Sequence, residues 1–255
     1  MKKFVGLFTV VQNQPLNSTN HRIVLQSSDP LPPIAAGQFA NVEVPGNKEV
    51  FLRRPFSIYE VDYSCNKLSL LVKILGKGSR TLTEIAEGSS LSLMYPLGNG
   101  FTLPQSGENV LGIGGGSGVA PILQLAKNAA NQSNMKVLLG ARTSTDHIAV
   151  DAYRSFAELG CATDDGSLGE HGLVTDHSFM KNLTQYDRIY ACGPLPMMKA
   201  VARLAQLSGV ACEVSLENLM ACGFGVCLCC IEPTVRGNLT VCTDGPVFNI
   251  NDLTW

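Results

Sequence analysis

The sequence predicts an N-terminal antiparallel β-barrel, an α/β domain with a mostly parallel sheet, and a small C-terminal module rich in cysteine. Three observations predict this order. The N-terminal part reads as short strands separated by turns, a glycine cluster then stands between an apolar run and a helical stretch, and four cysteines crowd into nine residues near the end. Short strands at this spacing are typical of a small barrel, whereas strand, glycine turn and helix open a nucleotide-binding unit. We therefore expect the three parts at residues 1–103, 108–212 and 213–255.

Turn residues divide the predicted barrel into its strands. Proline and glycine occur throughout Pro30–Gly37 before the third strand, and Pro45–Gly46 follows it directly. No helix-like segment is expected in this part before Leu82–Ile85. The strands are expected at Phe4–Gln12, His21–Gln26, Phe39–Val44, Arg54–Glu60, Lys67–Ile74 and Ser90–Met94.

Apolar runs and helical patterns alternate in the middle of the chain. The run Val110–Ile113 leads into the glycine cluster, and a helical pattern covers Val119–Asn131. Further apolar runs lie at Lys136–Gly140 and Arg188–Ala191, and the helical pattern Pro196–Leu207 follows the second of them. Strands that alternate with helices in this way predict a mostly parallel sheet.

Composition and charge exclude several classes of protein. The formal net charge of -2 gives no basic surface for a nucleic acid, and no apolar run approaches the roughly 18 residues of a membrane span. The charged fraction of 16% is low, so another subunit is expected to cover part of the surface. The start at Met1–Lys3 superficially resembles a signal peptide, but Phe4–Val11 lacks a small-residue cleavage site and is read as the first strand. The chain has nine cysteines, although it is long enough to fold without disulfide bonds. Free thiols persist in a reducing compartment, so this pattern favours the cytoplasm.

The strongest signal in the chain is the spacing of four cysteines. Cys222 and Cys227 are separated by four residues, Cys230 follows after two more, and Cys242 lies twelve positions later. This is the spacing of a plant-type two-iron ferredoxin site, in which four thiolates hold two irons. A structural zinc site and a set of buried free cysteines are the alternatives, although zinc is usually held by paired C-x2-C knuckles.

Residues between these cysteines support a wrapped cluster. Gly223 and Gly225 would let the loop backbone approach the sulfides and donate hydrogen bonds to them. Cys229 lies between two proposed ligands and is read as a non-ligand. The sequence therefore predicts metal ligands at Cys222, Cys227, Cys230 and Cys242.

Two motifs in the barrel are candidates for binding a flavin. Arg54 would neutralise a pyrophosphate and Ser57 would hydrogen-bond an isoalloxazine ring, although an arginine before a proline is more often plain surface. The short run Gly76–Ser79 opens a helical turn, where backbone N–H groups face a phosphate in other proteins. The candidate residues are Arg54, Pro55, Phe56, Ser57, Gly78 and Ser79.

The glycine cluster after the first strand of the α/β domain is a candidate nucleotide loop. It does not match G-x-G-x-x-G with an acidic partner cleanly, so a structural turn remains the alternative. A second turn follows a later strand and is expected at the same carboxyl edge of the sheet. A catalytic thiol at Cys192 is disfavoured because no histidine is near it in sequence. The two turns contain Gly114, Gly115, Gly116, Ser117, Gly118, Cys192, Gly193 and Pro194.

Taken together, these motifs resemble the ferredoxin-NADP reductase superfamily. Within it they are most similar to the electron-transfer subunits of NAD-dependent dihydroorotate dehydrogenase B, because Met220–Gly223 and the ending Val241–Phe248 also match. The resemblance implies a [2Fe-2S] cluster on the four cysteines and NAD at the glycine loop. It also implies an FAD in the barrel, held by Arg54–Ser57, Gly78–Ser79 and the strand residues Leu71, Val72 and Lys73.

The resemblance further implies a partner and a direction of electron flow. A separate FMN-containing subunit would oxidise dihydroorotate in pyrimidine (UMP) biosynthesis, and two copies of each subunit would form the working enzyme. Electrons would pass from FMN through the cluster and FAD to NAD, with no catalytic side chain required in this chain. Alternatives are a subunit of a sulfite reductase, hydrogenase or transhydrogenase complex, and a zinc-stabilised binding module. From the residues alone, Arg142 favours a 2′-phosphate on the nucleotide and Asp164 and Asp165 disfavour it.

Overall fold

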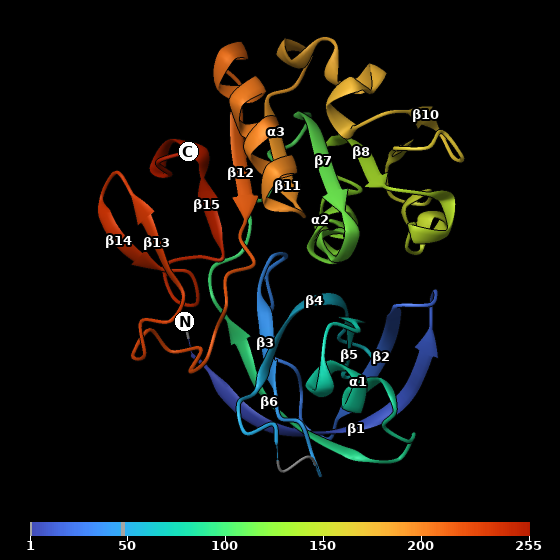
Figure 1. Cartoon of the computed structure of the whole chain (residues 1–255), viewed down its shortest axis with the longest axis vertical. Helices are drawn as coiled ribbons and strands as arrows, with labels where there is room; N and C mark the ends of the chain where they lie inside the picture. Colours follow the sequence, from blue (N-terminus) through green and yellow to red (C-terminus); the bar gives the residue numbers. More distant parts are fainter. Residues whose placement is uncertain (1, 47–48) are drawn as a thin grey trace.

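A closed barrel forms the N-terminal part of the protein in a computed structural model that describes residues 2–46 and 49–255 (Figure 1). Its neighbouring strands are antiparallel and follow the order β1-β2-β5-β4-β3-β6 around the barrel. The barrel predicted from the sequence is therefore confirmed. Its strands are β1 (Phe4–Pro15), β2 (Asn20–Ser27), β3 (Phe39–Val42), β4 (Arg54–Asp62), β5 (Lys67–Lys73) and β6 (Ser90–Leu97).

Alternating side chains fill the interior of the barrel. Phe8 and Val10 of β1 are buried while their neighbours along the strand are more exposed, because successive side chains of a strand point to opposite faces. Leu82 of α1 (Lys77–Thr83) is buried in the same core. This helix begins earlier than the sequence predicts, because the Ser79 hydroxyl accepts hydrogen bonds from two preceding backbone N–H groups at 2.9 and 3.1 Å.

The second part is a seven-stranded sheet with the order β10-β9-β8-β7-β11-β12-β15. All its neighbouring strands are parallel except the edge strand β15, which pairs antiparallel with β12. The predicted mostly parallel sheet is thus confirmed. Its strands are β7 (Asn109–Gly115), β8 (Asn134–Ala141), β9 (Glu158–Thr163), β10 (Glu170–His171), β11 (Arg188–Cys192), β12 (Ala211–Ser215) and β15 (Val247–Asn249).

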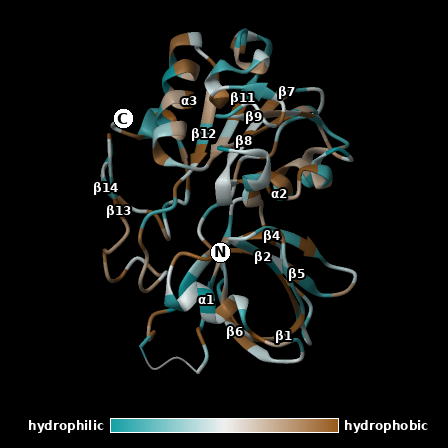
Figure 2. Ribbon diagram, turned by 45° about the vertical axis from the view of Figure 1, so that its right-hand side comes forward, coloured by the Kyte–Doolittle hydropathy of each residue, from teal (hydrophilic) through white to brown (hydrophobic). Residues whose placement is uncertain are grey.

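Helices cover both faces of this sheet. Val110 packs in the cluster that contains α2 (Val119–Ala129), whereas Leu111 and Ile113 pack with α3 (Leu195–Ser208). A strand covered on both faces reads as a continuous apolar run, which explains the signal that predicted it. Figure 2 shows hydrophobic and hydrophilic residues alternating along α3, as expected for a helix with one buried face.

Short 3-10 turns connect these elements, and a hairpin follows β12. The hairpin consists of β13 (Ile231–Thr234) and β14 (Gly237–Thr240), and the chain then returns to the sheet as β15. The expected boundary at residue 212 falls inside β12, so the division at that residue stays a prediction. The 3-10 turns are η1 (Gly116–Gly118), η2 (Ser144–Asp146), η3 (Val150–Tyr153), η4 (Val174–Asp176), η5 (Ser178–Met180), η6 (Leu183–Gln185) and η7 (Ile250–Asp252).

A buried carboxylate ties the barrel to the sheet. Glu213 of β12 accepts hydrogen bonds from the backbone N–H of Thr102 at 2.9 Å and from its hydroxyl at 2.6 Å. The hydroxyl of Tyr190 donates to the carbonyl of the same threonine at 2.8 Å, and Arg188 lies 3.6 Å from the carboxylate. The segment that leaves the barrel is therefore fixed to two neighbouring strands.

No helix within residues 2–46 and 49–255 combines the length and the apolar character that crossing a membrane requires.

Replacement of Glu213 by glutamine should lower the free energy of unfolding by about 1–3 kcal/mol, because a buried charged hydrogen-bond acceptor is lost. The measurement is equilibrium denaturation of the purified chain. Glu158→Gln is the matched control, since Glu158 pairs with Lys136 on the surface and should cost less than about 1 kcal/mol. Equal effects of the two substitutions would contradict this role.

Candidate cofactor sites

The four predicted metal ligands come together at the loop after β12 and the turn after β14. Their thiols form two pairs, Cys222 beside Cys227 and Cys230 beside Cys242. The second pair is buried at 2% and 1% exposure, whereas Cys222 is half-buried and Cys227 is exposed. No three His, Cys, Asp or Glu side chains in residues 2–46 and 49–255 are arranged around a single ion position. The four thiols nevertheless gather in one region of the chain, as a cluster held by four thiolates requires.

Backbone N–H groups point at these sulfurs. Those of Phe224 and Cys227 donate to Cys222 Sγ at 3.3 and 3.5 Å, and that of Gly225 donates to Cys242 Sγ at 3.1 Å. Burial opposes ionisation of the Cys222 thiol, but these N–H groups outweigh it and lower its pKa to about 6. Burial and the neighbouring Cys230 raise the pKa of Cys242 to about 12. A loop with N–H groups aimed at sulfur fits a thiolate-held cluster.

Two glycines of the cysteine loop have a left-handed backbone, and their predicted approach to the sulfides stays a prediction. Gly223 and Gly225 have φ of +75° and +78°, a region that side chains rarely allow. Cys229 is exposed, and its assignment as a non-ligand stays a prediction.

The structure brings two of the predicted flavin motifs together. A Cβ placed on Gly78 would lie 3.1 Å from Nε of Arg54, so this arginine lies over the start of α1. Its guanidinium donates to the backbone carbonyls of Leu52 and Arg53 at 2.8 and 3.3 Å. The hydroxyl of Ser79 accepts hydrogen bonds from the backbone N–H groups of Leu75 and Gly76, and its part in binding a flavin stays a prediction.

The strand residues predicted to contact the flavin differ in what they can offer. Leu71 and Val72 are buried at 4% and 0% exposure, and Val72 packs inside the barrel. Val72 can therefore meet a cofactor only through its backbone. Lys73 ends the strand and lines the cavity between barrel and sheet. The flavin ligand set as a whole stays a prediction.

A cavity of about 540 Å³ lies between the barrel and the carboxyl edge of the sheet. Gly115 and Gly116 of the glycine loop line it together with Pro194 and Met197 at the start of α3. A smaller hollow of about 400 Å³ lies at the amino ends of the strands, near Tyr186. Parallel sheets bind ligands at their carboxyl edge, so the larger cavity is the candidate nucleotide pocket.

The glycine loop and the turn after β11 touch behind this pocket. A Cβ on Gly118 would lie 2.2 Å from the carbonyl oxygen of Cys192, and one on Gly193 would lie 2.9 Å from that of Gly115. These positions therefore require glycine. Cys192 is fully buried, and burial raises the pKa of its thiol well above the ordinary value. Its environment therefore opposes formation of a nucleophilic thiolate.

Sequence reasoning missed one acidic residue at the same edge. Glu217 follows β12, and its environment includes Lys73 from the barrel and Ser117 from the glycine loop. The residue is exposed to solvent, although protein atoms surround much of its carboxyl group. Burial raises the pKa of this carboxyl, and Lys73 and Ser117 oppose the shift. No spacing rule could have identified it, because its neighbours come from distant segments.

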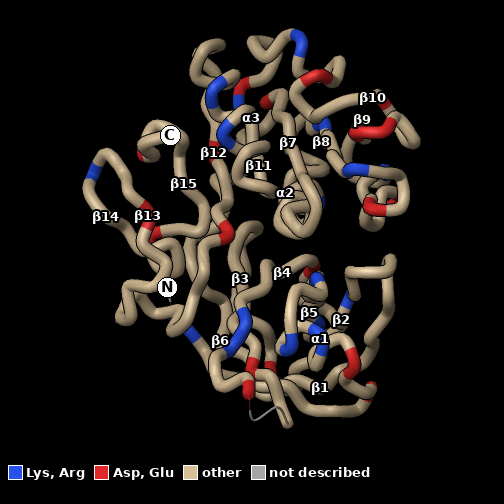
Figure 3. The backbone as a smooth tube through the Cα atoms, viewed as in Figure 1, with Lys and Arg blue, Asp and Glu red and all other residues tan. Residues whose placement is uncertain are grey.

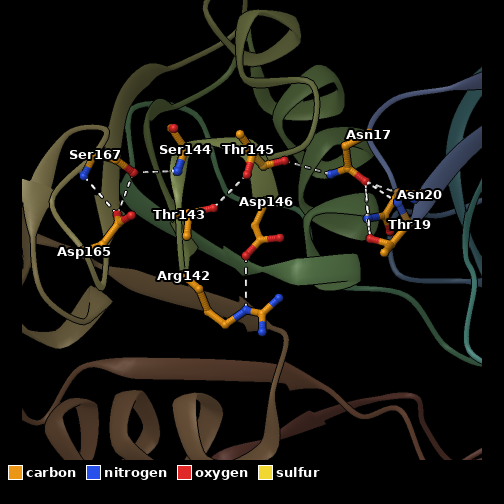
Figure 4. Close-up of polar contacts among 10 residues, drawn as sticks. All are labelled: Asn17, Thr19, Asn20, Arg142, Thr143, Ser144, Thr145, Asp146, Asp165 and Ser167. Atoms are coloured by element: carbon orange, nitrogen blue, oxygen red, sulfur yellow. Dashed lines mark hydrogen bonds and ion pairs between the residues drawn. The ribbon is translucent and has the colours of Figure 1, made fainter.

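Polar residues form part of the pocket lining and of the loops beside it, and Figure 4 shows their contacts. Arg142 forms an ion pair with Asp146 at 3.1 Å, and both line the cavity with Asp164. The side-chain amide of Asn17, from the barrel, donates to the carbonyl of Thr145 at 3.3 Å. Acidic and basic positions both occur along this edge of the sheet (Figure 3).

Comparisons with known proteins agree with this layout. The model of the iron-sulfur cluster binding domain of dihydroorotate dehydrogenase B matches residues 217–254, and that of the oxidoreductase NAD-binding domain matches residues 113–203. The chain is 38% identical to the "Dihydroorotate dehydrogenase B (NAD(+)), electron transfer subunit" of Caldanaerobacter subterraneus, over 83% of this chain and 84% of the relative. It is 32% identical to the protein of the same name from Shouchella clausii, over 99% of each chain.

Solved structures show the same arrangement. A structure of an NADH-dependent reduced ferredoxin-NADP oxidoreductase, described for flavin-based electron bifurcation, has a TM-score of 0.87 and 29% identity, covering 97% of this chain and 90% of that one. A ferredoxin reductase of carbazole 1,9a-dioxygenase has a TM-score of 0.72 and 25% identity, covering 82% and 67%.

Replacing any one of the four proposed ligands by serine should lower the iron and acid-labile sulfide content of the anaerobically purified chain, because a two-iron cluster needs four thiolates. The four variants carry the substitution at Cys222, Cys227, Cys230 or Cys242. Cys229→Ser is the matched control and should retain about two irons per chain. The measurement is chemical iron and sulfide analysis with the visible spectrum. Full cluster content in any of the four variants would remove that residue from the ligand set.

Proposed function

Because this chain belongs to the family of electron transfer subunits of NAD-dependent dihydroorotate dehydrogenase B, we propose that it carries electrons from the FMN of a dihydroorotate-oxidising partner subunit to NAD. Its cofactors are FAD and an iron-sulfur cluster, with NAD as the exchangeable substrate. The proposed path runs through a [2Fe-2S] cluster and FAD, and the proposed setting is pyrimidine (UMP) biosynthesis in the cytoplasm. The nine unbridged cysteines are compatible with that compartment.

One observation carries this proposal: the cysteine loop and the nucleotide pocket both border the barrel. The loop contacts β3, where the side-chain amide of Asn41 donates to the carbonyl of Ala221 at 3.5 Å, and it contacts β6, where a Cβ on Gly223 would lie 3.3 Å from Leu97. The pocket borders β5 at Lys73. A cofactor held in the barrel would therefore have the one-electron site and the hydride acceptor as neighbours.

The residues around each proposed site would contribute in different ways to binding the cofactors. Flavin supplies the chemistry that joins the two ends, because it accepts single electrons and also exchanges a hydride with a nicotinamide. Arg54, over the start of α1, would neutralise a pyrophosphate. Pro194 and Met197 would give the nucleotide an apolar surface to pack against, and the N–H groups of the cysteine loop would stabilise thiolate charge.

An exposed apolar surface around the cysteine loop supports a protein partner. It is formed by Leu219, Phe224, Val226 and Leu228, whose exposures range from 41% to 85%. Contiguous apolar side chains of this kind are uncommon on surfaces that face only water. We propose that the FMN-containing subunit covers them, in an assembly with two copies of each subunit.

The structural likeness to a bifurcating oxidoreductase favours one alternative, a subunit of a transhydrogenase-type complex. The two functions differ in the electron donor. A partner that oxidises dihydroorotate supports the first, whereas a partner that exchanges electrons with ferredoxin supports the second.

The test is reconstitution with the purified FMN subunit. Dihydroorotate should then reduce NAD, followed as NADH absorbance, only when both subunits are present. A Cys227→Ser chain should lose this coupled activity while still reducing an artificial acceptor with NADH, because the flavin and nucleotide sites remain. Coupled activity at the full rate in that variant, or no NADH formation with the wild-type chain, would contradict the proposed path.

A further inference from the structure

We propose that Asp146 sets a preference for NAD over NADP by occupying Arg142, an inference that rests on the proposed use of the cavity for a nicotinamide nucleotide. NADP differs from NAD by one phosphate on the adenosine 2′-hydroxyl. Arginine is the side chain that best recognises such a phosphate, because its guanidinium offers several donors in a fixed plane. Arg142 is the only arginine among the described residues that line the cavity.

The ion pair with Asp146 weakens the ability of Arg142 to bind a phosphate. Nε of Arg142 lies 3.1 Å from Oδ2 of Asp146, four residues later, and the two side chains approach each other in Figure 4. Their side chains are 79% and 32% exposed, so the guanidinium remains reachable by a ligand while its charge is already compensated. A 2′-phosphate would therefore compete with the Asp146 carboxylate for the Arg142 guanidinium.

A second carboxylate strengthens the discrimination. Asp164 also lines the cavity, and the N–H groups of Asp164 and Asp165 donate to the carbonyls of Ala141 and Arg142, both at 3.2 Å. The acidic turn is thereby attached beside the arginine. The carboxylates of Asp146 and Asp164 outnumber the single guanidinium of Arg142, so together these groups repel a phosphate. The same carboxylates can accept hydrogen bonds from a ribose hydroxyl. The side chain of Asp165 is occupied by Ser167, at 2.6 Å from its hydroxyl.

The loop that carries the pair is held from both sides. On one side, Asn17 of the barrel donates to the carbonyl of Thr145 at 3.3 Å. On the other, the backbone N–H of Ser144 donates to the hydroxyl of Ser167 at 2.8 Å. The backbone just before Asp146 is therefore fixed at Ser144 and Thr145, which keeps this carboxylate beside Arg142.

The test is isothermal titration of the full chain, loaded with its FAD and cluster, with 5′-AMP and with adenosine 2′,5′-bisphosphate. Asp146→Asn should improve binding of the bisphosphate about tenfold, the scale of one charge-assisted hydrogen bond, and leave 5′-AMP within about twofold. The double substitution Asp146→Asn with Arg142→Gln should abolish the gain. The gain should also shrink as salt is raised, because the interaction is between charges.

Asp151→Asn is the matched control. Asp151 pairs with Arg154 at 3.0 Å in the same domain, but neither residue lines the cavity, so the ratio of the two affinities should not change. Wild-type-like binding of both probes by Asp146→Asn, or an equal shift in Asp151→Asn, would overturn the inference and leave the nucleotide pocket standing. Absence of binding of either probe to the wild-type chain would overturn the pocket assignment and the inference together.

Discussion

The buried carboxylate of Glu213 is the contact on which the arrangement of the whole chain depends. It accepts two hydrogen bonds from Thr102, which lies in the segment between the barrel and the sheet, and it projects from β12, the strand between β11 and the edge strand β15. Tyr190 of the neighbouring strand holds the carbonyl of the same threonine and packs edge-on against Phe101 at 5.4 Å. Because a buried carboxylate is costly without such partners, the barrel and the sheet have one favoured arrangement.

The position of β12 decides where both ends of the proposed electron path lie. Shortly after this strand, Glu217 lies near Lys73 of the barrel, and the chain then forms the cysteine loop, which contacts the barrel. The side-chain amide of Asn41 holds that loop against the barrel by donating a hydrogen bond to the carbonyl of Ala221. One strand thus connects the nucleotide pocket with the thiol pairs, and the barrel lies against both.

Few charged side chains line the cavity, so each one has a large effect on the binding of a charged ligand. Lys73 and Arg142 are the cations that line the cavity in the described residues, and Asp146 and Asp164 are the acids. Screening is weaker in a partly enclosed space than on an open surface, so exchanging one charge there has a larger effect than exchanging one elsewhere. The low charged fraction of the sequence is therefore compatible with a site in which selectivity rests on a few side chains.

The sequence by itself determined the elements and the cysteine signature, because both are encoded locally. Val110–Ile113 and α3 could be read from apolar runs and helical periodicity, and the spacing of Cys222 to Cys242 follows from the bonding needs of a cluster. Only the tertiary structure decided that the Arg142–Asp146 pair lines a cavity together with Lys73 of the barrel, and that Glu217 lies near that lysine. Local rules cannot supply these facts, because contacts between distant segments depend on how strands order and pack in space.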